Sequence, residues 1–370
     1  AFHRGYGNDN TAMAESRITM TKKIENFEWT SLLDLTGKGL SQFNAVGKNM
    51  NCTQLMRNAG LDWQVELKPS KWVSNDGDIM TSKKYKSLVK IDGQEEDYLV
   101  GNLTEGKNGY HPMQNESLAR LGDYFAELKN LSFEHCFSYD NSKAITFLAN
   151  TGGSFNIGDD KVNNYLMFNN FHTGRDKSKI NTTNINIWCS NTFLTALKDN
   201  DQFMISITHR IEFNSDLEQL VKSKIDQALQ SNEQYKEQAI TLNGKQITES
   251  EMLKYFVLVY NPQLVKEFEK AGMTHKAFND VTGSGMTQIK RCYGVYNDMF
   301  ESNGKTYKLQ NTGNAVRSDT MWKAFNCVTY NEDHLRGGFD NGDSRLKNTF
   351  TMNGADNIKT RAMSTALELV

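Results

Sequence analysis

The chain has 370 residues, of which 38% are hydrophobic and 23% charged, and its formal net charge is −2 at pH 7. Its many aromatic residues supply enough apolar surface for a packed core, which excludes a largely disordered chain, and no apolar stretch reaches the roughly 18–20 residues that a membrane span needs. The balanced charge excludes a uniformly basic protein, although the 42 Lys and Arg can still gather on one face.

The predicted organisation has three parts. The first 25 residues are rich in Gly, Asn and Thr and lack hydrophobic periodicity, so residues 1–25 are expected to form a mobile arm or an arm that docks on a neighbouring subunit. The remaining chain is longer than one hydrophobic core usually supports, which favours two units. We place a sheet-bearing α+β domain at residues 26–214 and a helical domain at residues 215–370.

The first half of the chain carries the alternation of apolar and polar residues that is typical of an antiparallel sheet with one buried face. A short helix is expected to end at Gly60, in the left-handed conformation that glycine adopts readily, and a strand begins near Trp63. Further strands are predicted at residues 145–149, 165–171, 185–189 and 203–213, with helices at 118–128 and 190–198.

The second half follows the periodicity of amphipathic helices. Capping-box spacings that begin at Ser215 and at Thr248 each predict the start of a helix. Asn261-Pro262 begins another, which Gly272 closes. Further helices are predicted at residues 288–301, 318–333 and 357–369. The predicted fold class is therefore α+β, with an antiparallel sheet of hairpins in the N-terminal half and a mainly helical C-terminal half.

Motifs for catalysis are weak. Gly101–Asn108 has the spacing of a phosphate-binding loop, but Asn108 stands where a Ser or Thr should hold Mg²⁺, so a polar hairpin loop is the favoured interpretation. His209 alternates with Ile207 and Ile211, which favours a core histidine over a metal ligand or a base. We therefore predict no cofactor, no metal site and no catalytic residue, and a role other than catalysis is favoured.

The cysteines indicate a reducing environment. The five residues are odd in number, widely spaced and free of the C-x-x-C pattern, so free thiols are expected rather than a disulfide framework. The N-terminal residues lack the apolar segment of a secretory signal. The predicted location is the cytoplasm.

Two basic segments with aromatic neighbours are the candidate nucleic-acid-binding sites. Phosphates attract Lys and Arg, and exposed rings can stack on bases. Residues 168–179 are predicted to form the tip of a long hairpin. The candidate residues are Phe171, Arg175, Lys177 and Lys179 in that hairpin, and Lys83, Lys84 and Lys86 beside Tyr85 in the second segment. The alternative, that these segments are solubilising loops, stays open, and Trp188 is a further stacking candidate.

Four short islands carry a family resemblance: residues 58–63 (NAGLDW), 189–192 (CSNT), 207–210 (ITHR) and 322–334 (WKAFNCVTYNEDH). In this order they resemble the phage/plasmid-like protein family, a domain of unknown function common in phages and mobile elements, over roughly residues 50–370. The resemblance implies a mobile-element protein of the host-cell cytoplasm and supplies no catalytic residues. By fold analogy alone, hairpins followed by a helix at 190–198 are similar to the core of single-strand annealing proteins.

The predicted function is single-strand nucleic-acid binding, in annealing or recombination, by a homo-oligomer. Its alternative is a non-catalytic structural or interaction protein of a phage, acting in assembly or in binding a host factor. A metal-dependent nuclease is the third hypothesis and needs clustered carboxylates that the sequence spacing does not show.

Overall fold

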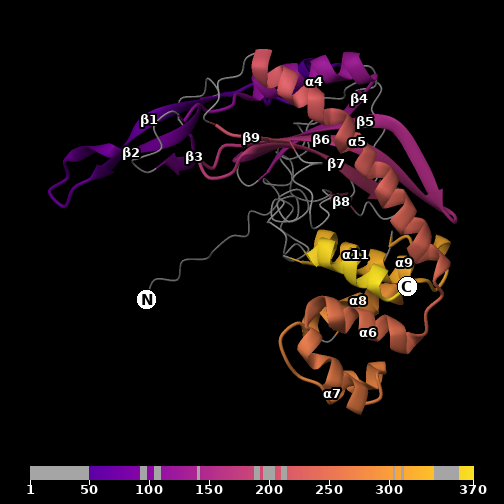
Figure 1. Ribbon diagram of the computed structural model, residues 1–370. Coiled ribbons are helices and arrows are strands. Elements are labelled where there is room, and N and C mark those ends of the chain that lie inside the picture. The colour runs from indigo at the N-terminus through magenta and orange to yellow at the C-terminus, as the bar shows by residue number, and fades with distance from the viewer. Residues whose placement is uncertain are drawn as a thin grey trace, which may run out of the picture.

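The computed structural model describes residues 50–91, 98–103, 110–139, 142–186, 192–194, 205–209, 215–302, 305–309, 312–336 and 358–370. Within these ranges the two larger sheets lie in the first half of the chain, and most helices and one two-stranded hairpin lie in the second (Figure 1). The predicted α+β class is therefore confirmed. The proposed N-terminal arm and Trp188 lie outside the described residues.

A short helix and a three-stranded sheet open the described chain. Helix α3 (Cys52–Asn58) begins with a capping box at Asn51 and is followed by Gly60 at φ +65°, as predicted. Strands β1 (Gln64–Val73), β2 (Ile79–Ile91) and β3 (Tyr98–Leu103) form an antiparallel sheet in that order. The outer part of β1 and β2 projects from the rest of the molecule as a two-stranded ribbon (Figure 1).

A second antiparallel sheet forms the body of this half. Its strands are β4 (Ser132–Tyr139), β5 (Ala144–Ile157), β6 (Asp160–Phe171), β7 (Ser178–Asn186), β8 (Thr192–Leu194) and β9 (Ile205–Ile207), in the order β4-β5-β6-β7-β8 with β9 also paired to β7. Helix α4 (Asn115–Lys129) covers one face through Leu118, Leu121 and Phe125, which are fully buried. Apolar residues on alternate strand positions thus face the helix, as the sequence pattern predicted. The expectation of a single buried face was wrong for this part of the sheet, because all residues of 144–149 in β5 and 164–171 in β6 are buried.

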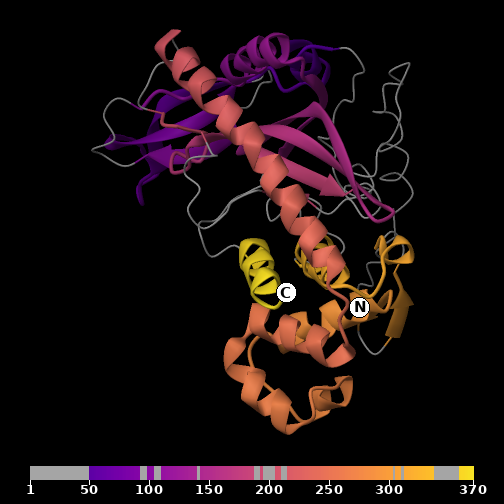
Figure 2. The same cartoon turned by 45° about the vertical axis from the view of Figure 1, so that its right-hand side comes forward.

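Helix α5 (Ser215–Gly244) connects the two halves of the molecule (Figure 2). At 30 residues it is about 45 Å long. The helical half comprises α6 (Glu249–Tyr260), η2 (Pro262–Leu264), α7 (Val265–Lys270), η3 (His275–Asn279), α8 (Met286–Tyr296), the hairpin of β10 (Met299–Ser302) and β11 (Lys305–Lys308), η4 (Asn314–Val316), α9 (Met321–Tyr330), the π-helix η5 (Asn331–Leu335) and α11 (Ile358–Glu368). None of the described helices is long and apolar enough to cross a membrane.

Two predicted helices were wrong in part. Within the helix expected at residues 190–198, Thr192–Leu194 instead form β8, because they pair with Thr183–Ile185 of β7. The helix expected to reach Glu301 ends at Tyr296, and Asp298 at φ +56° turns the chain into β10. Short apolar runs fit either periodicity, so the available strand partner decided the outcome. Because Thr192–Leu194 form a strand, the helix predicted at residues 190–198, on which the analogy with annealing proteins rested, is not formed.

The buried residues form two hydrophobic clusters, one in each half. The far end of the β5–β6 hairpin belongs to the cluster of the helical half, through Phe155, Ile157 and Val162. In the turn of that hairpin the fully buried carboxylate of Asp160 accepts hydrogen bonds from Arg317 Nε at 2.6 Å and from Trp322 Nε1 at 3.0 Å. A buried ion pair therefore fastens the large sheet to the helices.

Candidate nucleic-acid interface

The β1–β2 ribbon carries most of the exposed large apolar side chains of the described chain. Nine such residues are exposed, and five of them lie on this ribbon: Trp72 (52%), Val73 (68%), Ile79 (72%), Met80 (45%) and Tyr85 (53%). Contiguous exposed apolar residues on a projecting element mark an interaction site rather than an ordinary surface. The ribbon is thus the most prominent candidate for contact with another molecule.

A wide bulge interrupts the ribbon. Between the pairs Pro69–Lys86 and Lys71–Thr81, β1 has a single residue, whereas β2 has the four residues 82–85. Ser82 orders the bulge, because its hydroxyl accepts hydrogen bonds from the backbone N–H groups of Lys84 at 3.1 Å and Tyr85 at 2.8 Å. Such bulges re-aim side chains. Here Lys83, Lys84 and Tyr85 are all held exposed.

The ribbon is basic although the protein is not. Residues 68–90 contain six lysines and two aspartates, a surplus of positive charge in a chain whose net charge is −2. Lys83 and Lys86 are exposed and make no ion pair within the part of the chain that the structure describes. A local basic surface of this kind is the electrostatic feature that attracts phosphates.

The predicted hairpin tip at residues 168–179 is a shorter and more ordered turn. Thr173 closes it, since its hydroxyl donates to Asp176 at 2.7 Å and accepts from two backbone N–H groups. Arg175 and Lys177 are exposed there. Lys179 is half-buried with its Nζ 5.9 Å from the centre of the Phe171 ring, and burial lowers the pKa of Lys179.

Phe171 itself does not present its ring to solvent. It is only 3% exposed and lies at the end of β6. Its aromatic face is therefore closed to a base in this structure, and Tyr85 is the exposed ring near a basic cluster. Of the predicted site residues, Arg175, Lys177, Lys83, Lys84 and Lys86 remain candidates for contact with a ligand.

Strand β3 contacts both basic segments. Leu103 pairs with Lys86 of β2. The backbone of the β6–β7 turn packs against β3 at Gly101, where a Cβ would lie 2.8 Å from the carbonyl oxygen of Thr173. Glycine is needed at this close approach. Two segments that are about ninety residues apart in the sequence thus both contact β3.

A buried polar network supports the β6–β7 turn from below. The side-chain amide of Asn170 donates to the carbonyl of Met113 at 2.8 Å and accepts from Ser178 Oγ at 2.7 Å. His172 Nε2 lies 2.8 Å from Asn115 Oδ1. Burial lowers the pKa of His172 to about 3, so this ring is neutral at physiological pH. These bonds hold the turn that carries Arg175 and Lys177, while His172 Nδ1 is buried without a hydrogen-bond partner among the described residues.

A second buried histidine makes the stability of the sheet sensitive to pH. His135 on β4 is 1% exposed, and burial lowers its pKa from 6.5 to about 4. Because the folded-state pKa lies below the unfolded value, its contribution to stability is complete above pH 6.5 and is lost as the pH falls toward 4. We expect the free energy of unfolding to fall by roughly 3 kcal/mol more between pH 7 and pH 4 in the wild-type protein than in His135→Leu, measured by urea denaturation. Parallel pH profiles would contradict this assignment.

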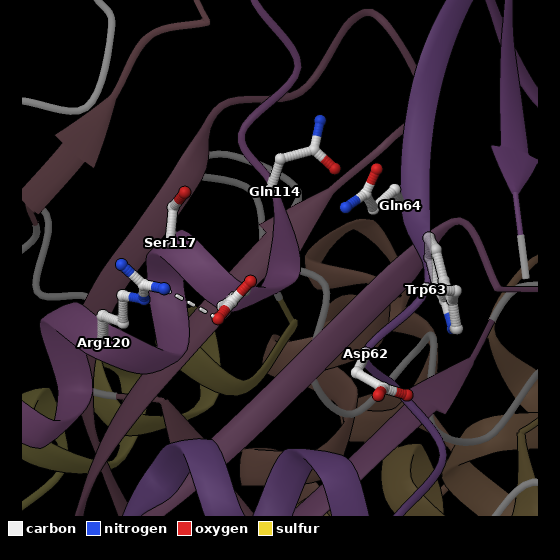
Figure 3. A pocket seen from close by; sticks show the side chains of 7 residues that line it. Asp62, Trp63, Gln64, Gln114, Ser117 and Arg120 are labelled. Atoms are coloured by element: carbon white, nitrogen blue, oxygen red, sulfur yellow. Dashed lines mark hydrogen bonds and ion pairs between the residues drawn. The ribbon is translucent and has the colours of Figure 1, made fainter.

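A polar pocket lies at the foot of the ribbon (Figure 3). Its volume is about 320 Å³, and it is lined by Asp62, Trp63, Gln64, Gln114, Glu116, Ser117 and Arg120. The bond from Arg120 to Glu116 at 2.9 Å, together with the charge of Arg57, holds the pKa of that carboxyl below its usual range. The amide of Gln114 pairs with both backbone groups of Val65 at 3.0 Å. These bonds fix the base of the ribbon against α4.

Other predicted features have structural roles or lie outside the description. His209 is buried, as expected, and stacks on Tyr110 with ring centres 4.9 Å apart. The four cysteines in the described residues are buried free thiols. Of the phosphate-loop motif, Gly101–Leu103 belong to β3, and the remainder lies outside the described residues. Among the residues that the structure describes, no group of His, Cys, Asp and Glu could hold a metal ion.

The most distinctive sequence island, residues 322–334, proves to be largely buried. Trp322 binds Asp160, Asp333 pairs with the buried Lys359 of α11, and Glu332 accepts from Tyr260 Oη at 3.0 Å. The last residues of the island form the π-helix that follows α9. The recognisable residues of this island therefore hold the helical half together and attach it to the sheet.

The fold and this surface define an α+β protein that combines a two-stranded basic ribbon with a helical half fastened by buried ion pairs. The chain belongs to the family described as Domain of unknown function (DUF932), whose model matches residues 103–364. The ribbon precedes the matched region. Neither a curated protein nor a solved structure gives a significant match to the chain.

Proposed function

We propose that this protein binds single-stranded nucleic acid on the basic surface formed by the β2 bulge and the β6–β7 turn, in a phage or mobile-element setting. The observation that carries the proposal is the bulge, which exposes Lys83 and Lys84 together with the Tyr85 ring. Lysines bind backbone phosphates regardless of sequence, and an exposed ring stacks on an unpaired base. A duplex keeps its bases stacked, so the aromatic contribution favours the single strand.

Fluorescence-anisotropy titration of the purified protein against labelled single- and double-stranded oligonucleotides tests this function. At two salt concentrations we expect single-strand-preferring binding that weakens as salt rises, because phosphate contacts release counterions. An absence of binding at low salt would reject the proposal and leave a structural or protein-interaction role as the working hypothesis.

The β6–β7 turn is expected to make a smaller contribution than the bulge. Replacing Arg175 and Lys177 with glutamine removes two phosphate contacts without burying a polar group, because both side chains are exposed. The slope of log affinity against log salt should fall by about 1.4 for a single strand. The matched control replaces Lys266 and Lys270, which are exposed on α7 at the far end of the molecule (Figure 1). Equal slopes in the two variants would exclude the turn from the interface.

A further inference from the structure

Among the described strands β1 pairs only with β2, so it is the edge strand of the three-stranded sheet. Backbone groups along a strand point alternately toward its partner and away from it. At the inner end both backbone groups of Val65 bind the Gln114 side chain, so they point away from β2. At the outer end Ser74 N donates to Asp78 O across the turn, so Ser74 faces inward. Both ends therefore agree: the odd-numbered residues of β1 direct their backbone N–H and C=O groups away from β2, and the even-numbered residues direct them toward it.

This phase places the backbone groups of Leu67, Pro69, Lys71 and Val73 on the outer edge. Proline has no N–H to donate, so Pro69 occupies a position at which the ribbon loses no hydrogen bond. None of the described strands pairs with the outer edge of β1 between Leu67 and Val73. The edge is long and its tip is apolar, with Trp72 and Val73 both more than half exposed. An open edge of this kind is a template for strand addition.

We propose that β1 pairs in an antiparallel manner with β1 of a second copy of this chain, about a two-fold axis at Ser70. In that register Leu67 lies opposite Val73 of the second copy, and Lys71 lies opposite its Pro69. About six backbone hydrogen bonds form across the axis, because only the two prolines lack a donor. Centring the pairing on Pro69 or on Lys71 instead gives about four.

The side chains select the same register. Centring on Ser70 places no two like charges opposite each other, since Lys68 faces Trp72 and Lys71 faces Pro69 of the second copy. It also sets Leu67 beside Val73 of the second copy, which covers an exposed apolar side chain. Centring on Lys71 would oppose two lysines, and centring on Pro69 would place Trp72 opposite Glu66. Because the axis is two-fold, every contact occurs twice and the assembly closes as a dimer.

The dimer leaves the proposed nucleic-acid surface open. The bulge belongs to β2, the middle strand of the sheet, whereas the contact uses the outer edge of β1. The pairing does not depend on nucleic-acid binding, and its test contains no nucleic acid. Failure of one proposal therefore leaves the other intact.

Disulfide trapping of Ser70→Cys tests the register. Opposite residues at a non-hydrogen-bonded position lie about 4.5 Å apart between Cα atoms, within the range of a disulfide. We expect oxidation to convert most of the full-length variant to a covalent dimer on a non-reducing gel, while Lys71→Cys, which faces Pro69 of the second copy, stays largely monomeric. Comparable cross-linking of both variants, or of neither, would overturn the register.

Sedimentation of the wild-type protein and of Lys71→Pro/Val73→Pro tests the pairing itself. Both N–H groups point outward, so the ribbon keeps its bonds to β2 while the dimer loses bonds across the axis. The dissociation constant of the dimer should rise more than tenfold, with unchanged circular dichroism. A wild-type protein that remains monomeric at micromolar concentration, or a variant that dimerises equally well, would refute the proposal.

Discussion

Replacing Asp160 with alanine is expected to destabilise the protein by about 3–5 kcal/mol, because it leaves the buried Arg317 guanidinium without its counter-charge. The side chains of both residues are at most 1% exposed. Arg317 also donates to the carbonyl of Thr312 at 2.7 Å, and the carboxylate accepts from Trp322 as well. The lost stability therefore comes from the contact between the β5–β6 hairpin and the helical half.

Urea denaturation at neutral pH measures this effect. The neighbouring Asp159→Ala is the matched control, since Asp159 is exposed in the same turn, and it should change stability by less than about 0.5 kcal/mol. The double variant Asp160→Leu/Arg317→Met should be more stable than Asp160→Ala, because no charge remains buried. A loss below about 1 kcal/mol in Asp160→Ala would show that the ion pair does not fasten the two halves.

Replacing Lys83, Lys84 and Lys86 with glutamine is expected to weaken single-strand binding roughly a hundredfold or more at low salt. All three side chains are exposed on or beside the bulge, so the change leaves the core untouched. Each lost phosphate contact lowers the salt slope by about 0.7, which gives a total decrease of about 2. Anisotropy titration from low to moderate salt measures both quantities.

Tyr85→Ala separates stacking from charge. The variant should lose about 1–3 kcal/mol of binding free energy per stacked base while it keeps the wild-type salt slope. Thermal unfolding of Tyr85→Ala and of the triple lysine variant provides the control, since substitutions of exposed side chains should leave the melting temperature nearly unchanged. A lysine variant whose slope equals that of the wild type would place the nucleic acid elsewhere on the protein.

Local sequence patterns determined most of the elements. Thr248 and Glu251 form the predicted reciprocal cap, with Thr248 N donating to Glu251 Oε2 at 2.8 Å at the start of α6. The Asn261-Pro262 signal starts a helical turn, and Gly272 at φ +88° ends the helix that follows. These features depend on neighbours within a few residues, so the sequence alone contains the information.

Elements that depend on a distant partner were predicted less well. Thr192–Leu194 become a strand because they pair with Thr183–Ile185 along the edge of β7. The bulge in β2 exists because β2 has four residues between the pairs Pro69–Lys86 and Lys71–Thr81, whereas β1 has one. The sequence showed the lysines beside Tyr85 but gave no sign that Trp72 and Met80 would extend the same ribbon as exposed apolar residues. Exposure depends on what packs against a strand, and alternation alone does not show it.

The sequence by itself determined the α+β class, the order of most helices and strands, the free buried cysteines and which lysines are candidates for phosphate contact. Only the tertiary structure decided that Phe171 is closed to solvent, that β3 contacts both basic segments, and that Asp160 meets Arg317 across 157 positions of chain. Hydrophobic periodicity and caps act over a few residues, so they fix local structure. Burial and ion pairing arise between segments that meet only when the whole chain has folded, and a local pattern does not encode them.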